Sequence, residues 1–73
     1  MIIKKGAILD VKHSRSGNWT GIATEDFDTE KDEWYPLALA QEEIVEGMNI
    51  FWEKSNDMPA RRGLCTVKLK EIN

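Results

Sequence analysis

Residues 11–39 read VKHSRSGNWTGIATEDFDTEKDEWYPLAL, and the rest of the chain is organised around this stretch, which holds two of the three tryptophans. Ser16, Gly17 and Asn18 are residue types that tolerate positive φ, so the chain can reverse there as a hairpin. The pattern predicts hairpin strands over 7–12, with Ala7, Leu9 and Val11 on one face, and over 19–25. Gly21 in the second strand indicates a bulge or a close approach of the backbone.

The segment 26–33, DFDTEKDE, is the most highly charged part of the chain. Its alternating acids invite comparison with a calcium-binding EF-hand loop. Lys31 stands where that loop requires glycine, however, and Leu37 stands where it requires a bidentate glutamate. The segment is therefore predicted to be a solvated loop without a metal, and Phe27 is expected to fold back onto the core as its anchor.

The segment 34–40, WYPLALA, allows two interpretations. Tyr35, Leu37 and Leu39 alternate as in a strand, with Pro36 at an edge or bulge and a short turn over 41–47. Alternatively, a helix runs over 36–46 with Gly47 as its C-terminal cap. Tyr35 is a poor helix N-cap, and three glutamates near the negative end of the helix dipole are unfavourable, so we favour the strand.

Alternation returns over 48–54, and a polar connection over 55–63 leads into a last strand over 64–72. In that strand Cys65, Val67 and Leu69 are predicted to face the core, with lysines on the other side. Five short strands in one domain over 1–73 predict an all-β fold, a small antiparallel barrel. An α+β fold with the helix at 36–46 is the alternative.

The order of these strands resembles the SH3-like small β-barrels. Within that class, the hairpin sequence VKHSRSGNWTG is similar to one in the plasmid-encoded type II dihydrofolate reductases. Those enzymes act through a Val-Gln-Ile-Tyr segment, whereas residues 66–69 here read Thr-Val-Lys-Leu. The resemblance implies the fold and does not extend to the activity.

Composition limits the classes of function. The chain has 73 residues, one cysteine and one histidine, which excludes an internal disulfide and any Cys/His zinc site. The N-terminal segment has no long apolar run, so we expect a cytoplasmic protein without a membrane span. A core this small also makes homo-oligomers possible, because self-association buries additional surface.

Catalysis is not expected from this sequence. His13 lies beside Ser14 and Ser16, but a catalytic triad is assembled from distant parts of a fold and needs an orienting carboxylate. No phosphate-binding glycine loop occurs, and the carboxylates of the acidic segment lie where nothing would raise their pKa values. We therefore predict a protein that is not an enzyme and that needs no cofactor.

Charge is separated along the chain: residues 1–20 carry +3, residues 21–46 carry −8 and residues 47–73 carry +2. The first functional hypothesis is a small binding module that recognises a protein partner, because aromatic strips flanked by acids suit basic or proline-rich peptides. The candidate binding residues are Trp19, Asp26, Asp28, Asp32, Trp34, Tyr35 and Phe51.

Two alternatives use the charges differently. If the first and last strands are neighbours, their basic residues form a face for nucleic acid. The candidates for that face are Lys4, Lys5, Lys12, Arg15, Arg61, Arg62, Lys68 and Lys70. In the other alternative, the acidic loop mimics a phosphate backbone, as in inhibitors encoded by phages or mobile elements.

Overall fold

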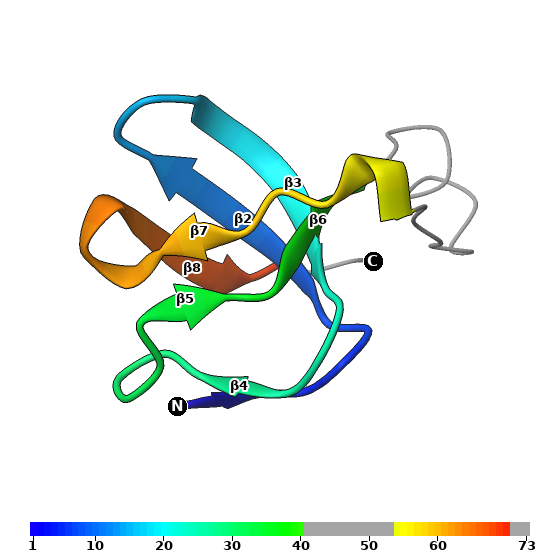
Figure 1. Cartoon of the computed structure of the whole chain (residues 1–73), viewed down its shortest axis with the longest axis vertical. Helices are drawn as coiled ribbons and strands as arrows, with labels where there is room; N and C mark the ends of the chain where they lie inside the picture. Colours follow the sequence, from blue (N-terminus) through cyan, green and yellow to red (C-terminus); the bar gives the residue numbers. More distant parts are fainter. Residues whose placement is uncertain (41–53, 71–73) are drawn as a thin grey trace.

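The computed structural model describes residues 1–40 and 54–70, and most of this part of the chain is β-strand (Figure 1). Within these two ranges there is no α-helix, and nothing there is suited to span a membrane as an apolar helix. The prediction of an all-β fold is confirmed.

The largest sheet is antiparallel and contains β2 (Ile8–His13), β3 (Gly17–Ala23), β6 (Leu37–Leu39) and β8 (Cys65–Leu69), in the order β6-β3-β2-β8. β2 and β3 form the predicted hairpin, with His13 opposite Gly17. Gly17 has a φ of 81°, which glycine adopts without the steric cost of a Cβ. The sequence also predicted that the first strand of the hairpin and the last strand are neighbours. This is confirmed, because β2 pairs with β8.

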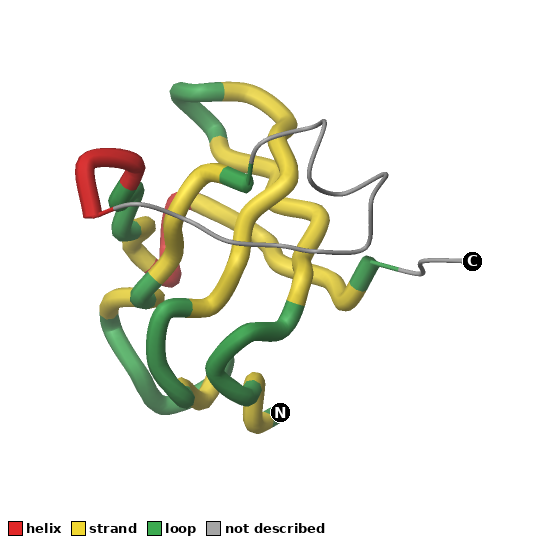
Figure 2. The backbone as a smooth tube through the Cα atoms, turned by 90° about the vertical axis from the view of Figure 1, so that its right-hand side faces the viewer, coloured by secondary structure: helices red, strands yellow, loops and turns green. Residues whose placement is uncertain are grey.

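Two smaller antiparallel sheets complete the described fold. β1 (Ile2–Ile3) pairs with β4 (Phe27–Asp28), and β5 (Trp34–Tyr35) pairs with β7 (Ala60–Arg61). Two short 3-10 helices, η1 (Lys54–Asn56) and η2 (Arg62–Leu64), flank β7 in the sequence. Figure 1 shows β5 and β7 on the viewer's side of β2 and β8. Figure 2 shows the path of the strands from a view turned by 90°.

All three sheets contribute to one apolar core. Phe27 of β4 packs on Tyr35 of β5, with 4.8 Å between the ring centroids. Phe27 therefore anchors the acidic segment as predicted. The buried residues of the core cluster are Ile3, Leu9, Val11, Ala23, Phe27, Tyr35, Leu37, Ala60 and Cys65.

The predicted five-stranded barrel is not confirmed, because none of the described sheets is closed. The predicted strand over 48–54 lies almost wholly outside the described residues, and its last residue, Lys54, opens η1. The alternative helix over 36–46 is wrong at its start, where Leu37–Leu39 forms β6. The rest of that helix, from residue 41, lies outside the described residues.

Leu69, which was predicted to face the core, is exposed, and so is Leu39 of the alternating segment 34–40. Leu39 projects to the surface, while its neighbour Ala38 is fully buried between Ile22 of β3 and a bridge to Asp57. In β8 the exposure increases along the strand: Cys65 is buried, Val67 is half-buried and Leu69 is 50% exposed. The reason is position, since β8 is at the edge of its sheet and Leu69 is at the end of β8.

Candidate functional site

The short ladder between β5 and β7 places one tryptophan on the surface. Trp34 pairs with Arg61, and Tyr35 pairs with Ala60. Because successive side chains of a strand point to opposite faces, Tyr35 and Ala60 enter the core and Trp34 and Arg61 face solvent. Trp34 is 57% exposed, and its backbone is held by the buried neighbours on the ladder.

Charged residues are neighbours of Trp34: Glu33 precedes it in the sequence, and Arg61 is its partner on the ladder. The Glu33 carboxylate lies 3.9 Å from Nη2 of Arg61 and 3.5 Å from Nη2 of Arg62. The backbone N–H of Arg62 also donates to the Glu33 carbonyl at 2.9 Å, and its guanidinium donates to the carbonyl of Glu30. We call Glu33, Trp34, Arg61 and Arg62 the Trp34 surface. The two ion pairs and the two hydrogen bonds connect the end of the acidic segment to the junction between β7 and η2.

The aspartates predicted to bind a partner, Asp26, Asp28 and Asp32, accept backbone hydrogen bonds that stabilise the acidic segment. The Asp26 carboxylate accepts a hydrogen bond from the backbone N–H of Lys5 at 2.7 Å, and this bond lowers the pKa of Asp26. Asp28 accepts one from the N–H of Glu30 at 2.9 Å, which lowers the pKa of Asp28. Asp32 accepts one from the N–H of Asp28 at 2.7 Å. The segment is therefore an ordered loop around β4, with its aspartates already bonded to backbone donors.

The other predicted aromatic residues take different positions. Tyr35 is buried, and its hydroxyl donates to the Thr29 carbonyl at 2.6 Å; burial raises the pKa of this phenol. Trp19 is half-buried against the core, and its indole N–H donates to Oγ of Ser16 at 3.0 Å. Phe51 lies outside the described residues. Of the predicted aromatic residues that the structure describes, Trp34 is the one with most of its surface open to a partner.

Three of the predicted basic residues share a face. The β2–β8 register pairs Asp10 with Lys68 and Lys12 with Thr66, so these side chains lie on the outer face of the sheet. Nζ of Lys70 reaches the same face, 3.2 Å from Oγ1 of Thr20. A hollow of about 430 Å³ lies there, lined by Asp10, Lys12, Thr66, Val67 and Lys68.

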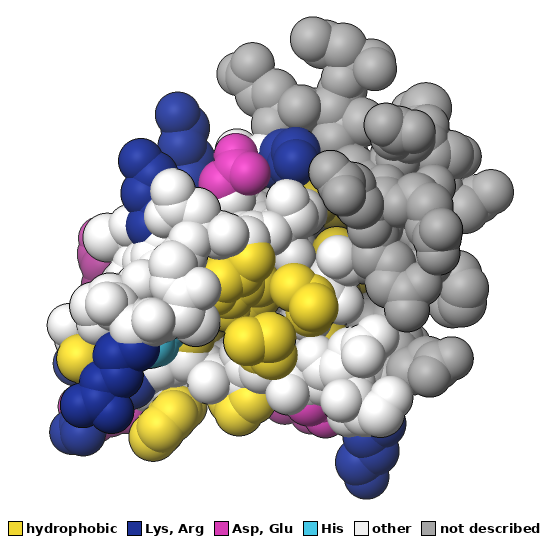
Figure 3. Space-filling model, turned by 90° about the horizontal axis from the view of Figure 1, so that it is seen from above, with side chains coloured by type: hydrophobic (Ala, Val, Ile, Leu, Met, Phe, Trp, Pro, Cys, Tyr) yellow, Lys and Arg dark blue, Asp and Glu magenta, His cyan; other side chains and the backbone are white. Residues whose placement is uncertain are grey.

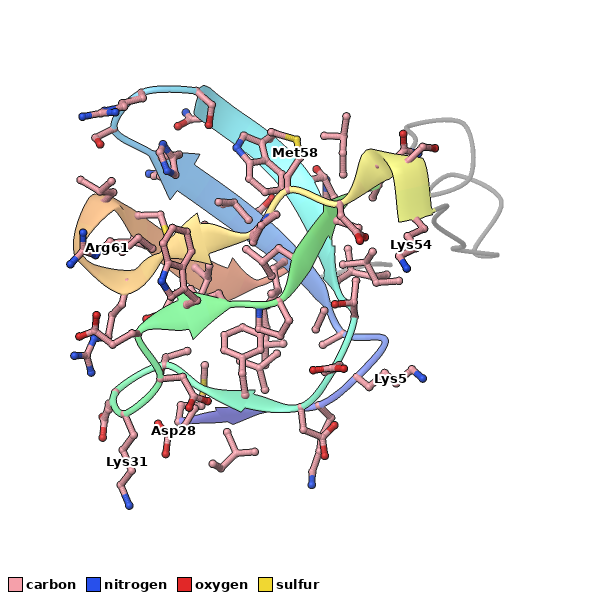
Figure 4. All side chains as sticks on the ribbon, in the orientation of Figure 1. Lys5, Asp28, Lys31, Lys54, Met58 and Arg61 are labelled. Atoms are coloured by element: carbon pink, nitrogen blue, oxygen red, sulfur yellow. The ribbon has the colours of Figure 1, made fainter. Side chains whose placement is uncertain are left out.

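The remaining basic residues are dispersed. Lys4 and Lys5 bond to Asp26 at the turn before β2, Arg15 is in the β2–β3 loop, and Arg61 and Arg62 belong to the Trp34 surface. Figure 3 shows basic side chains at separate places around the rim of the molecule. In Figure 4, Lys5, Lys54 and Arg61 likewise project from different corners.

The one histidine of the chain has a structural role. Nδ1 of His13 accepts hydrogen bonds from the backbone N–H groups of Arg15 and Ser16, at 3.1 and 3.3 Å, and so shapes the hairpin loop. Within 1–40 and 54–70, no three His, Cys, Asp or Glu side chains are grouped as metal ligands. Comparison of the chain with protein-family models, with curated proteins and with solved structures gave no match.

Proposed function

We propose that this protein is a small, non-enzymatic binding module that recognises a protein partner through the Trp34 surface. The observation that carries the proposal is the exposure of Trp34 on a paired strand. Tryptophan dominates the binding energy of many protein interfaces, because it buries a large apolar area at a low cost in side-chain entropy. The ladder to β7 fixes the backbone of Trp34, which lowers the entropic cost of binding further.

The surrounding charge indicates the chemistry of the partner. Glu33 already offsets part of the charge of Arg61 and Arg62. The adjoining segment 25–33 carries six carboxylates and one lysine, so a negative field extends beside the indole. A complementary partner presents an apolar pocket for Trp34 with basic groups beside it, and its association is faster at low salt.

The test is a comparison of matched variants against the partner. Trp34→Ala and Ile2→Ala each remove a large exposed apolar side chain, of 57% and 56% exposure, from different parts of the molecule. Affinity capture identifies the partner, and titration of the purified pair gives its Kd. We expect Trp34→Ala to weaken binding about 30-fold or more, the effect of a hot-spot residue. Ile2→Ala should leave the Kd unchanged.

Binding by Trp34→Ala at wild-type affinity would refute the role of this surface. Both variants should keep the wild-type melting temperature, since neither side chain belongs to the core cluster. If the captured partner binds nucleic acid and oligonucleotides displace the module, the acidic segment acts as a phosphate mimic.

A second candidate function is nucleic-acid binding, and one observation favours it. The β2–β8 pairing brings Lys12, Lys68 and Lys70 onto one face beside a hollow. Asp10 lies among them, with a carboxylate oxygen 3.9 Å from Nζ of Lys70. The net charge of this face is therefore only +2, which makes it the weaker candidate.

A further inference from the structure

β8 is the edge strand of the largest sheet. The order β6-β3-β2-β8 gives β8 one neighbour, β2. In the part of the chain that the structure describes, no other strand pairs with the opposite side of β8. An open edge exposes a row of unpaired N–H and C=O groups, which is a template for pairing with another strand.

The register shows which residues form that row. The N–H of Lys70 donates to the Ile8 carbonyl, and the N–H of Ser14 donates to the Leu64 carbonyl, both at 2.9 Å. The even-numbered residues of this strand therefore direct their backbone groups toward β2. Because this direction alternates along an antiparallel strand, Cys65, Val67 and Leu69 direct theirs toward the open edge.

The apolar side chains of the same residues extend the core face to this edge. Leu69 is opposite Leu9 on that face, yet Leu9 is fully buried and Leu69 is 50% exposed. Val67 is half-buried opposite the buried Val11. The apolar face that carries Leu9 and Val11 on β2 thus continues onto β8, where Val67 and Leu69 leave it partly exposed to solvent.

We propose that the occupant of this edge is a second copy of the chain, whose β8 pairs antiparallel with the first about a two-fold axis at Val67. This register places Val67 opposite Val67, Cys65 opposite Leu69 and Thr66 opposite Lys68. Apolar residues then face apolar residues, and each lysine at 68 faces a threonine, so no like charges are directly opposed.

Neighbouring registers are less favourable. An axis at Lys68 would place the two lysines directly opposite each other, which is destabilising. An axis at Thr66 would leave Leu69 opposite Gly63. The axis at Val67 is the one that pairs all five residues of β8, and it joins the two four-stranded sheets into one sheet of eight strands. Such an interface is isologous, as in most homodimers.

The first test measures mass against concentration by sedimentation equilibrium. A single strand pair buries little area, so we expect a weak dimer that forms reversibly as the concentration rises. Leu69→Lys places a charge among the apolar residues of the proposed interface, opposite Cys65 of the second copy, and should raise the dimer Kd at least tenfold. Ile2→Lys, at a side chain of similar exposure on β1, should leave that Kd unchanged. A wild-type protein that stays monomeric at about 1 mM would overturn the proposal.

The second test fixes the register with a symmetric disulfide. The background is Cys65→Ser, which keeps a donor for the Arg61 carbonyl that Sγ of Cys65 now contacts at 3.5 Å. In the proposed dimer, the two Cα atoms at position 67 lie about 5.5 Å apart, as in any hydrogen-bonded antiparallel pair. That separation suits a disulfide. Oxidation of the Val67→Cys variant should therefore give a covalent dimer.

Lys68→Cys in the same background is the matched control, because its opposite residue is Thr66. It should crosslink far more slowly than Val67→Cys. Equal crosslinking of the two variants, or faster crosslinking of Lys68→Cys, would overturn the proposed register. A dimer whose Kd is insensitive to Leu69→Lys would overturn the use of this edge.

Discussion

Gly21 lies where β2, β3 and β6 approach one another, and it has no room for a larger side chain. A Cβ at this position would lie 2.8 Å from Cζ3 of Trp19, 3.2 Å from Cγ2 of Val11 and 3.3 Å from the Ala38 carbonyl oxygen. Each contact is shorter than an ordinary van der Waals separation. The Trp19 ring therefore rests over Gly21 on the core face of the hairpin.

We predict that Gly21→Ala lowers the free energy of unfolding by about 1 to 3 kcal/mol, the usual cost of overpacking. Urea denaturation followed by tryptophan fluorescence measures it. Gly63→Ala is the matched control, since nothing lies within 4 Å of a Cβ built there. If the two variants unfolded at the same urea concentration, the close approach at Gly21 would have no energetic consequence.

At this scale the sequence was informative where one residue type is required. A glycine inside a β-rich strand predicted a close approach, and an aromatic residue amid acids predicted an anchor; both are found, at Gly21 and Phe27. Which of Trp34 and Tyr35 faces solvent was not decided by pattern alone. It follows from the pairing of Tyr35 with Ala60, a contact between residues 25 positions apart.

The acidic segment is an element with its own supports. β4 pairs with β1, Phe27 enters the core, and the Tyr35 hydroxyl donates to the Thr29 carbonyl. Burial raises the pKa of Tyr35 above its ordinary value of 10.0. The folded state therefore favours the protonated phenol, which is also the form that donates this hydrogen bond.

The free energy of unfolding depends on pH through the Tyr35 phenol. Because the folded pKa of Tyr35 is the higher one, its contribution to stability is complete below about pH 10 and is lost as the pH rises through the folded pKa. We predict that Tyr35→Phe is less stable than wild type by about 0.5 to 1.5 kcal/mol at neutral pH. That difference should shrink above about pH 10, measured by urea denaturation across the alkaline range.

Burial also raises the pKa of Cys65, which weakens the fold in the alkaline range by the same mechanism. Both proteins keep Cys65, so the effect of burying its thiol is common to the two. The charge of Cys65 also raises the pKa of Tyr35, in the same direction as burial does. A difference that stayed constant through the alkaline range would contradict the assigned role of the phenol.

The elements with a sequence period were found, and the elements without one were missed. β2 and β8 have six and five residues and alternate over most of their length, whereas β3 follows from its β-rich residue types and from the turn that precedes it. β1, β4 and β7 have two residues each, too few to show a period, and β4 lies in the segment 26–33 for which the sequence predicted a loop. β7 lies in what was interpreted as a polar connection, and only its pairing with β5 makes it a strand.

At the scale of the whole molecule, the three sheets formed by residues 1–40 and 54–70 contribute to one core, and none of these three is closed. Among the described residues, the separation of charge along the sequence does not produce two oppositely charged faces. Carboxylates of the acidic segment form ion pairs with Lys4, Arg61 and Arg62, which all come from the basic ends of the chain. Folding thus brings opposite charges together, an outcome that charge blocks in a sequence do not reveal.

The same arrangement predicts how the molecule responds to nucleic acid. Lys12, Lys68 and Lys70 remain on one face, with Asp10 beside them and a net charge of −3 on the whole chain. We therefore expect weak or no binding of single- and double-stranded oligonucleotides at about 50 mM salt, and none at about 200 mM. Fluorescence anisotropy with labelled oligonucleotides measures both conditions.

If oligonucleotides bind at low salt, charge-reversal variants identify the surface of the protein that contacts them. If Lys68 and Lys70 contact phosphates, Lys68→Glu and Lys70→Glu should each flatten the logarithmic dependence of affinity on salt by about 0.7 to 0.9. Lys31→Glu, which makes the same charge change in the acidic segment far from this face in Figure 4, should leave the slope unchanged. Tight binding that persists at the higher salt would make nucleic acid the better candidate partner than a protein. If such binding also survived Lys68→Glu and Lys70→Glu, the contact surface would lie elsewhere than on the outer face of β2 and β8.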